Sequence, residues 1–138
     1  DKVKWEGYGP NENYCDYKEA AKVGVYSKYI KDMFYEYVSP QENGERSGVS
    51  HLSLFGKNGE KLSVYANGDF FSFKVNDFIG KDLLKARHIT DLKRGETLEL
   101  AIDGYFSGVG SNSCGPELPE DKRITDKVLN FGVYFRFE

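Results

Sequence analysis

The sequence predicts an all-β protein folded as an antiparallel β-sandwich, and three observations support this prediction. The 138 residues include 10 Tyr and 10 Phe but only 1 Met, and aromatic side chains suit the pleated surface of a sheet. Asn-Gly occurs three times and Asp-Gly once, and these dipeptides are the strongest short indicators of a β-hairpin. Apolar residues also alternate with polar ones in several segments, as in strands with one buried face.

The first half of the chain contains a series of candidate elements. Residues 17–23 are a candidate for a short helical turn, and the aromatic-rich segment 33–38 is a candidate strand. Three further strands are predicted at 49–55, 62–65 and 70–75, separated by Asn-Gly turns. Because each turn lies between apolar runs, these three strands are expected to form a meander.

The second half of the chain continues the pattern. Residues 77–85 are a candidate for a helical turn, with Asn76 or Asp77 available as its cap. Alternation predicts two more strands, each with one buried face. One contains Leu98, Leu100 and Ile102, and the other contains Phe131, Val133, Phe135 and Phe137. Seven or so strands at this spacing are typical of a sandwich.

Length and charge limit the class of protein. A chain of this size buries about two-thirds of its extended surface, and no repeat or linker divides it, so we expect one domain over 1–138. The formal charge is -3 and no basic run is present, so we expect no nucleic-acid partner. Apolar stretches are far shorter than the roughly 20 residues of a membrane span, and the first residues lack the apolar centre of a signal peptide. We expect no membrane association and a cytoplasmic location, with export of a parent protein left open.

The two cysteines, Cys15 and Cys114, are too few for the disulfide framework of a small secreted domain. We expect both to be free thiols. Neither lies in a Cys-x-x-Cys pattern or near a His at a ligand spacing, so we expect no metal site in this chain.

Three stretches carry the most information about function. They are Gly-Pro-Asn-Glu-Asn-Tyr at 9–14, Pro-Gln-Glu-Asn-Gly-Glu-Arg at 40–46 and Gly-Val-Gly-Ser-Asn-Ser-Cys-Gly-Pro at 108–116. In this order and at these separations they resemble the carboxy-terminal domain of the large bacterial β-galactosidases of glycoside hydrolase family two, also called the β-galactosidase small chain. Trp5 before Gly7, and the segment 86–92, resemble further parts of that family. Cys15 stands where the family usually has Pro, and Tyr17 where it usually has Arg, which marks a distant relative.

The resemblance implies a fold and a role. The family's domain is a large antiparallel super-sandwich similar to the galactose mutarotases, and the present chain resembles its later half. The catalytic glutamates of the family lie on a separate (β/α)8-barrel that nothing in this sequence resembles. The resemblance therefore implies no catalytic residue and no hydrolysis by this chain alone. It also implies that Mg²⁺ and Na⁺, which the family often uses, bind elsewhere, and that the parent enzyme is an oligomer.

A glycine-rich loop is the candidate contact with substrate. In the family, the loop after the Ile-Asp-Gly strand, here 102–104, forms a wall of the galactoside pocket and presents a Trp to the sugar. Cys114 stands at the position of that Trp in this sequence. Glycines allow close backbone approach, and Asn112 and Ser113 can hydrogen-bond to hydroxyl groups. The resemblance thus implies Gly110, Asn112, Ser113 and Cys114 as substrate-binding residues. A plain connection between strands is the alternative.

Three other functions stay open from the residues. A free-standing carbohydrate-binding module would bind sugar through an aromatic platform without any barrel. A mutarotase-like enzyme would need His88 as a proton carrier beside Glu42 or Asp91, although a hydrogen-bonded structural role is the expectation for His88. A purely structural domain would use an exposed apolar face for contacts with other domains.

Polar residues of the first two stretches are expected to hold loops rather than to catalyse. Glu12, Asp16, Glu42 and Asp103 could be paired for glycoside hydrolysis, but any all-β domain with 22 acidic residues offers such pairs. Asn and Glu side chains commonly satisfy backbone groups in turns, and this role is expected for Glu12, Asn13, Glu42 and Asn43.

Four side chains carry individual expectations. We expect Arg46 to bridge a carboxylate in a bidentate manner. Core packing is expected for Trp5, Tyr8 is the better candidate of the two for exposure, and His51 is expected to be exposed.

Overall fold

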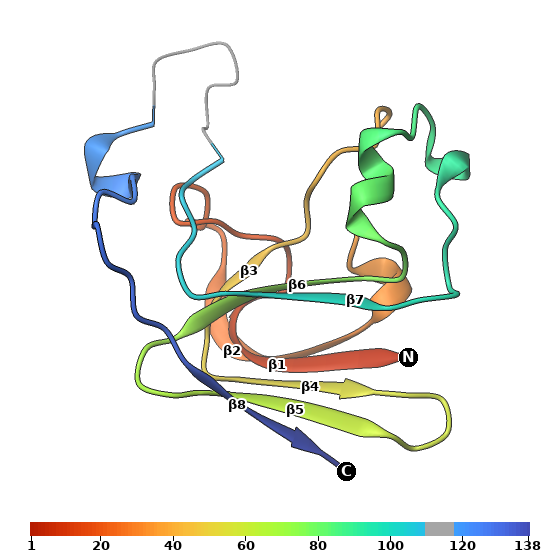
Figure 1. Ribbon diagram of the computed structural model, residues 1–138, viewed down its shortest axis with the longest axis horizontal. Coiled ribbons are helices and arrows are strands. Elements are labelled where there is room, and N and C mark those ends of the chain that lie inside the picture. The colour runs from red at the N-terminus through yellow and green to blue at the C-terminus, as the bar shows by residue number, and fades with distance from the viewer. Residues whose placement is uncertain (110–117) are drawn as a thin grey trace.

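The computed structural model describes residues 1–109 and 118–138, and the chain forms two antiparallel sheets (Figure 1). Eight strands are present in this part of the chain: β1 (Lys2–Gly9), β2 (Lys22–Tyr29), β3 (Arg46–Val49), β4 (His51–Phe55), β5 (Lys61–Ala66), β6 (Phe71–Asn76), β7 (Glu99–Asp103) and β8 (Val133–Phe137). Four short 3-10 helices lie between them: η1 (Ile30–Asp32), η2 (Gly80–Leu84), η3 (Ile89–Asp91) and η4 (Glu120–Lys122). The predicted all-β antiparallel sandwich is confirmed.

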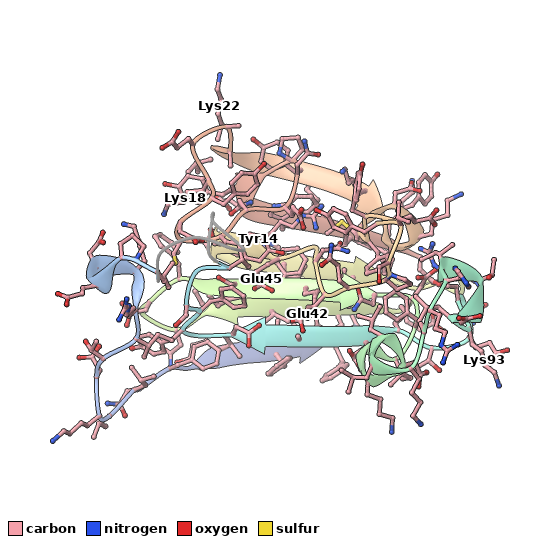
Figure 2. The ribbon with its side chains drawn as sticks, turned by 90° about the horizontal axis from the view of Figure 1, so that it is seen from above. Tyr14, Lys18, Lys22, Glu42, Glu45 and Lys93 are labelled. Atoms are coloured by element: carbon pink, nitrogen blue, oxygen red, sulfur yellow. The ribbon has the colours of Figure 1, made fainter. Side chains whose placement is uncertain are left out.

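The larger sheet has the strand order β2-β1-β4-β5-β8, and the smaller has the order β3-β6-β7. Burial alternates along β1, with Val3 and Trp5 buried and Lys2, Lys4 and Glu6 exposed. The larger sheet therefore turns one face to the core. Strand β2 lies at one edge, and Lys22 at its start points away from the molecule (Figure 2). The sequence pattern did not predict β1 and β2, because glycines interrupt the apolar alternation of both segments.

The predicted meander is only partly correct. Strands β4 and β5 form the expected hairpin, with Leu52 opposite Val64. Strand β6, however, pairs with β3 and β7 in the other sheet, and the free side of β5 pairs with β8. The chain crosses between the sheets after the turn at Gly68, whose φ is +95°. Because the chain crosses, the apolar face of β6 packs against the larger sheet. If β6 were instead a further strand of the larger sheet, the core-facing side of that sheet would be left partly uncovered.

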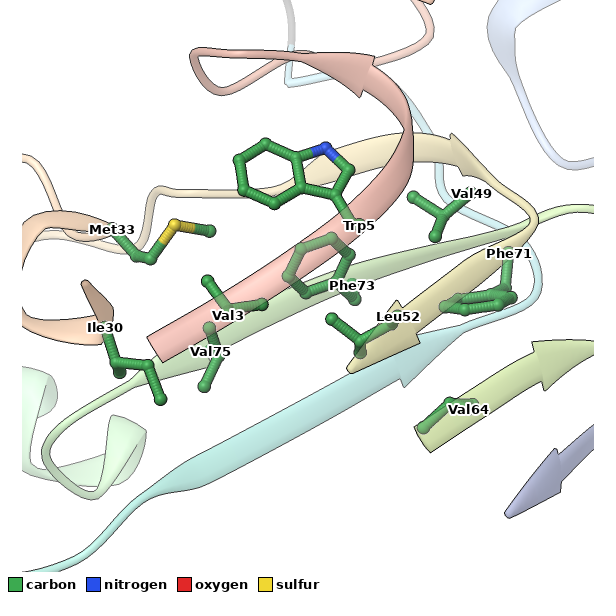
Figure 3. Close-up of a cluster of buried hydrophobic side chains, with 10 residues drawn as sticks. All are labelled: Val3, Trp5, Ile30, Met33, Val49, Leu52, Val64, Phe71, Phe73 and Val75. Atoms are coloured by element: carbon green, nitrogen blue, oxygen red, sulfur yellow. The ribbon is translucent and has the colours of Figure 1, made fainter. Parts of the chain in front are cut away.

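The core lies between the two sheets, and Figure 3 shows its side chains. Its buried members are Val3, Trp5, Ile30, Met33, Val49, Leu52, Val64, Phe71, Phe73 and Val75. Trp5 is 1% exposed, as expected, and its ring lies 5.5 Å from the Tyr26 ring and 5.7 Å from the Phe73 ring. Its indole Nε1 donates to the Tyr8 carbonyl oxygen at 3.0 Å. The ring is therefore packed on its faces and satisfied at its polar atom.

Two local predictions are wrong, and a third is correct except for its cap. Residues 33–38 form no strand, because Met33 and Phe34 are buried directly after η1 while the following residues run as loop. Residues 17–23 form no helix, since Tyr14 and Tyr17 make a β-bridge and β2 begins at Lys22. The helical turn expected at 77–85 is present as η2, but its N-cap is Ile79, with no side-chain hydrogen bond. Asn76 instead ends β6, where the chain is still extended.

The last strand does not have the buried face that its alternation predicts. Phe135 and Phe137 lie opposite Val64 and Leu62 of β5, so they share the face of β5 that carries buried Val64. Yet Phe135 is 53% exposed and Phe137 is 78% exposed. Strand β8 lies at the edge of the larger sheet, next to β5 (Figure 1). An apolar stripe of the sandwich interior is therefore open at this edge.

Candidate functional site

The structure brings the first two informative stretches, and the start of the third, to one end of the sandwich. The backbone N–H of Asn13 donates to the Glu45 carbonyl oxygen at 2.8 Å, and the Gly44 N–H donates to Glu12 Oε2 at 2.8 Å. The Val109 N–H donates to Asp16 Oδ1 at 3.1 Å. Segments that are distant in the sequence are thus joined by hydrogen bonds at the point where the glycine-rich loop begins.

Glu12 and Asn13 hold this assembly, as predicted for them. The two carboxylate oxygens of Glu12 accept from the Tyr37 hydroxyl at 3.1 Å and from the Tyr14 hydroxyl at 3.2 Å. Asn13 is fully buried, and its Oδ1 accepts from both the backbone N–H and the hydroxyl of Ser47. Because each oxygen binds a different segment, both side chains fix loops to one another.

Asn43 and Glu42 have different roles. The buried amide of Asn43 accepts from the Tyr35 N–H at 2.8 Å and donates to the Tyr35 carbonyl oxygen at 2.9 Å. These two hydrogen bonds to the backbone of one residue hold the segment after η1. Glu42 forms an ion pair with Lys74 of β6 rather than satisfying a turn backbone group. The loop-holding prediction is confirmed for Asn43, while Glu42 ties its loop to a strand.

The prediction that Arg46 bridges a carboxylate is wrong. The residue is 2% exposed, and its guanidinium donates to the carbonyl oxygens of Gly44 at 2.5 Å and Met33 at 3.2 Å. The group also lies over the Trp5 ring, 5.8 Å from its centroid. Burial lowers the pKa of Arg46 to about 10, so the side chain stays charged at neutral pH. Backbone carbonyls replace the carboxylate because Glu12 is already engaged by hydroxyl and amide donors.

A small cavity of about 120 Å³ lies at the root of the glycine-rich loop. Its walls are Tyr14, Glu42, Asn43, Glu45, Lys74, Phe106 and Val109. Tyr14, Glu45 and Glu42 lie near one another in Figure 2, and the rings of Tyr14 and Phe106 are 5.5 Å apart. Glu45 is 2% exposed, and its Oε1 has no hydrogen-bond partner among the described residues.

Charge in this cavity is unusual. Burial, and then the neighbouring Asp103, raise the pKa of Glu45 to about 8. Burial and the Glu12 carboxylate also raise the pKa of Tyr14. At neutral pH both groups therefore hold their protons. The Tyr14 hydroxyl already donates to Glu12, so the cavity presents the neutral Glu45 carboxyl group beside the Lys74–Glu42 ion pair. This arrangement suits hydrogen bonding to hydroxyl groups better than proton abstraction.

Glu45 predicts a pH dependence of stability. Its pKa is raised in the folded state, so its favourable contribution is complete below the ordinary value of 4.5 and is lost as pH rises to about 8. Glu45→Gln should remove this loss. Between pH 4.5 and about 8, the free energy of unfolding of Glu45→Gln should increase relative to that of wild type. The increase should be at most about 1.4 kcal/mol per pH unit. Urea unfolding of both chains across the range measures it, and a difference independent of pH would contradict the assignment.

The predicted substrate-binding residues Gly110, Asn112, Ser113 and Cys114 lie outside the described residues. The structure does define the anchor that precedes them. Gly108 packs against the Asp16 carboxylate so closely that a Cβ at this position would overlap it. Asp16 therefore fixes the start of the loop through its contact with Gly108 and its hydrogen bond with Val109.

The two histidines are not brought to this site. His88 is exposed, and its backbone N–H donates to the Asp91 carboxylate at 3.0 Å, so Asp91 acts as a turn residue. His88 does not line the cavity that contains Glu42, and the pairing needed for a mutarotase is not formed there. His51 is half-buried rather than exposed, because its ring stacks on Tyr65 at 4.5 Å. Tyr8 is also half-buried, beneath the ammonium of Lys18.

Three further observations concern cofactors and compartment. Within residues 1–109 and 118–138, no three His, Cys, Asp or Glu side chains are grouped as a metal ion would need. Cys15 is a free thiol, with Sγ 4.0 Å from the Lys122 carbonyl oxygen. No described helix has the length and apolar character needed to cross a membrane.

Sequence reasoning missed Glu45 as a site residue. The residue lies inside the second informative stretch, between Gly44 and Arg46, but its burial depends on the packing of three distant segments. A carboxylate next to a glycine turn is usually exposed. The hydrogen bond of the Asn13 N–H with the Glu45 carbonyl oxygen is one of the contacts that hold this segment inside the molecule.

Comparison with known proteins identifies what this arrangement is similar to. The family profile described as "Beta galactosidase small chain" matches residues 1–135. The chain is 36% identical to the beta-galactosidase of Kluyveromyces lactis over 136 residues, which is 98% of this chain and 13% of that protein. It is 36% identical to the beta-galactosidase of Actinobacillus pleuropneumoniae over 135 residues and 38% identical to that of Oenococcus oeni over 130 residues, covering 96% and 94% of this chain. The chain spans 12 to 13% of the length of these relatives.

Proposed function

Since this chain belongs to the beta-galactosidase small chain family, we propose that it is a non-catalytic domain of a larger β-galactosidase, and that it completes the sugar-binding site beside the catalytic barrel. The observation that carries this proposal is the convergence of the informative stretches at the root of the glycine-rich loop, where Asp16 holds Val109. A loop that reaches into another domain needs a rigid base on its own domain.

The proposal assigns the contact with galactoside to the loop. Gly110, Asn112, Ser113 and Cys114 would line one side of the sugar pocket, with Asn112 and Ser113 hydrogen-bonding to hydroxyl groups. Cys114 offers less apolar surface than the Trp expected at its position, so we propose weaker stacking on the sugar here than in other members. Lactose and other β-D-galactosides are the proposed substrates of the whole enzyme, and its catalytic acids, Mg²⁺ and Na⁺ are proposed to lie on its other domains.

The partner of this chain is proposed to be the rest of the parent enzyme. The relatives are about eight times longer than the matched region, which supports further domains on the same polypeptide. The half-exposed rings of β8 support a contact with those domains, because exposed apolar stripes usually mark interaction sites. We propose a cytoplasmic, oligomeric parent enzyme.

Reconstitution tests this function. The parent enzyme truncated before this domain should hydrolyse o-nitrophenyl galactoside poorly, and addition of the 138-residue chain in trans should restore turnover. The Asp16→Ala chain should raise KM at least about threefold, which is the low end of what one hydrogen bond contributes, because the loop is no longer held at Val109. Far-ultraviolet circular dichroism checks that the variant is folded.

Asp69→Ala is the matched control, because Asp69 is exposed in the β5–β6 turn and lines neither the cavity nor the groove. It should leave KM unchanged. Full activity of the truncated enzyme without the chain, or hydrolysis by the 138-residue chain alone, would contradict the proposed role.

A further inference from the structure

A groove of about 820 Å³ adjoins the root of the loop and is not used in the proposed function. Residues 9–12 and 16–21 line it together with residues of the segment that follows β2, and Lys28 and Arg46 complete its wall. Its volume falls in the range of about 300–1,000 Å³ that is typical of small-molecule sites. The groove is therefore large enough to hold a ligand of two or three sugar rings.

Three tyrosines line this groove. Tyr17 is 62% exposed and Tyr35 is 63% exposed, and Tyr37 lies beside Tyr35 with ring centroids 4.6 Å apart. Single exposed aromatic residues are common on protein surfaces. Three in one concave surface provide an extended amphipathic lining, with apolar ring faces and polar hydroxyl ends.

A polar network behind the groove fixes the backbone of Tyr35 and the hydroxyl group of Tyr37. Buried Asn43 makes hydrogen bonds of 2.8 and 2.9 Å with the N–H and the carbonyl oxygen of Tyr35. The Tyr37 hydroxyl donates to Glu12 Oε1 at 3.1 Å, and Glu12 in turn accepts from the Gly44 N–H. A surface fixed in this way loses little conformational entropy when a ligand binds. Buried polar groups thus support an aromatic lining that is open to solvent.

The charges of the groove select the class of ligand. The groove is lined by four carboxylates, those of Glu12, Asp16, Glu19 and Asp32, and by three cationic residues, Lys18, Lys28 and the largely buried Arg46. The two signs nearly balance, so a phosphate or another strong anion gains little net attraction. A mixture of donors and acceptors next to aromatic rings instead complements a neutral molecule with many hydroxyl groups and apolar C–H faces.

We propose that this groove binds a neutral saccharide of two or more rings. The rings of Tyr17 and Tyr35 pack against C–H faces, and the Glu12 and Asp32 carboxylates and the Lys28 ammonium bind hydroxyl groups. The inference goes beyond the proposed function, because the groove is formed by residues outside the 110–117 loop and needs no barrel to bind sugar.

Titration of the ¹⁵N-labelled 138-residue chain with lactose and with β-1,4-galactotriose tests the groove. Additions up to about 50 mM cover millimolar dissociation constants. Saturable shifts of amide resonances should concentrate in residues 9–21 and 32–37. Tyr35→Ala should weaken binding at least about fivefold, as for a central aromatic contact. Tyr17→Ala provides an independent test of a second exposed ring.

Tyr134→Ala is the matched control, since Tyr134 is 60% exposed but lies on β8, outside the groove. It should leave the dissociation constant unchanged. Absence of saturable shifts in the wild-type chain, or equal binding by the Tyr35, Tyr17 and Tyr134 variants, would overturn the inference. A negative titration would leave the proposed function standing, because the reconstitution experiment measures turnover by the assembled enzyme and not sugar binding in this groove.

Discussion

Trp5→Ala is expected to lower the free energy of unfolding by about 3–5 kcal/mol. Trp5 is 1% exposed on β1, an interior strand of the larger sheet, and its ring contacts Tyr26 and Phe73. The substitution removes these contacts and leaves a cavity, and it also leaves the Tyr8 carbonyl oxygen without its indole donor. Because domains of this size have total stabilities of about 5–15 kcal/mol, the loss is a large fraction of the whole.

Urea unfolding followed by circular dichroism measures this effect. The midpoint should fall by roughly 2 M. Circular dichroism is the appropriate probe because Trp5 is the chain's single tryptophan and its fluorescence disappears with the substitution. Val38→Ala serves as the control, since Val38 is 99% exposed, and its effect should lie within about 0.5 kcal/mol. A change of less than about 1 kcal/mol for Trp5→Ala would show that the indole does not support the core as described.

Arg46→Met should cost about 3 kcal/mol, which is the second largest expected effect. The guanidinium joins the ends of three segments by donating to the carbonyl oxygens of Gly44 and Met33 and, at 3.5 Å, to that of Pro10. Met fills similar space but donates nothing, so buried acceptors lose their partners. Arg46→Lys should recover only part of the stability, because an ammonium group cannot reproduce the planar fork of the guanidinium.

A double-mutant cycle separates this effect from that of Trp5. The two side chains are in contact, with the guanidinium 5.8 Å from the ring centroid, so their effects should be non-additive by about 0.5–3 kcal/mol. Strict additivity would indicate that Arg46 acts only through its carbonyl partners. Full stability of Arg46→Met would refute the assignment of Arg46 as the residue that joins the loops.

Strand positions could be predicted from sequence where turn chemistry and alternation agree. The β4–β5 hairpin has both an Asn-Gly turn and clear apolar runs, and it was predicted correctly. The partner of β6 could not be predicted, because the same turn residues serve a hairpin and a crossing between sheets. The choice is made by burial of Phe71 and Phe73 against the other sheet, which is a tertiary effect.

The candidate site was predictable in its parts but not in its assembly. The informative stretches were recognised as sequence motifs, and the loop-holding roles of Glu12, Asn13 and Asn43 followed from the chemistry of Asn and Glu in turns. Their convergence depends on hydrogen bonds between residues more than 30 positions apart, such as that of Glu12 with Gly44. The carbonyl partners of Arg46 could not be predicted either, because the pattern of side chains in a sequence does not indicate which backbone oxygens will accept hydrogen bonds.

The exposed apolar edge at β8 would couple the free energy of unfolding of this domain to the binding of a polypeptide that covers that edge. Burying Phe135 and Phe137, now 53% and 78% exposed, against a neighbouring domain would carry a negative heat-capacity change. Binding of the covering polypeptide would then stabilise the folded state of this domain. The apparent melting temperature of the separate chain would therefore rise with the concentration of that polypeptide. If the covering domain belongs to the same polypeptide, the linkage between the domains would set its local concentration, and docking would add to the stability that the core supplies.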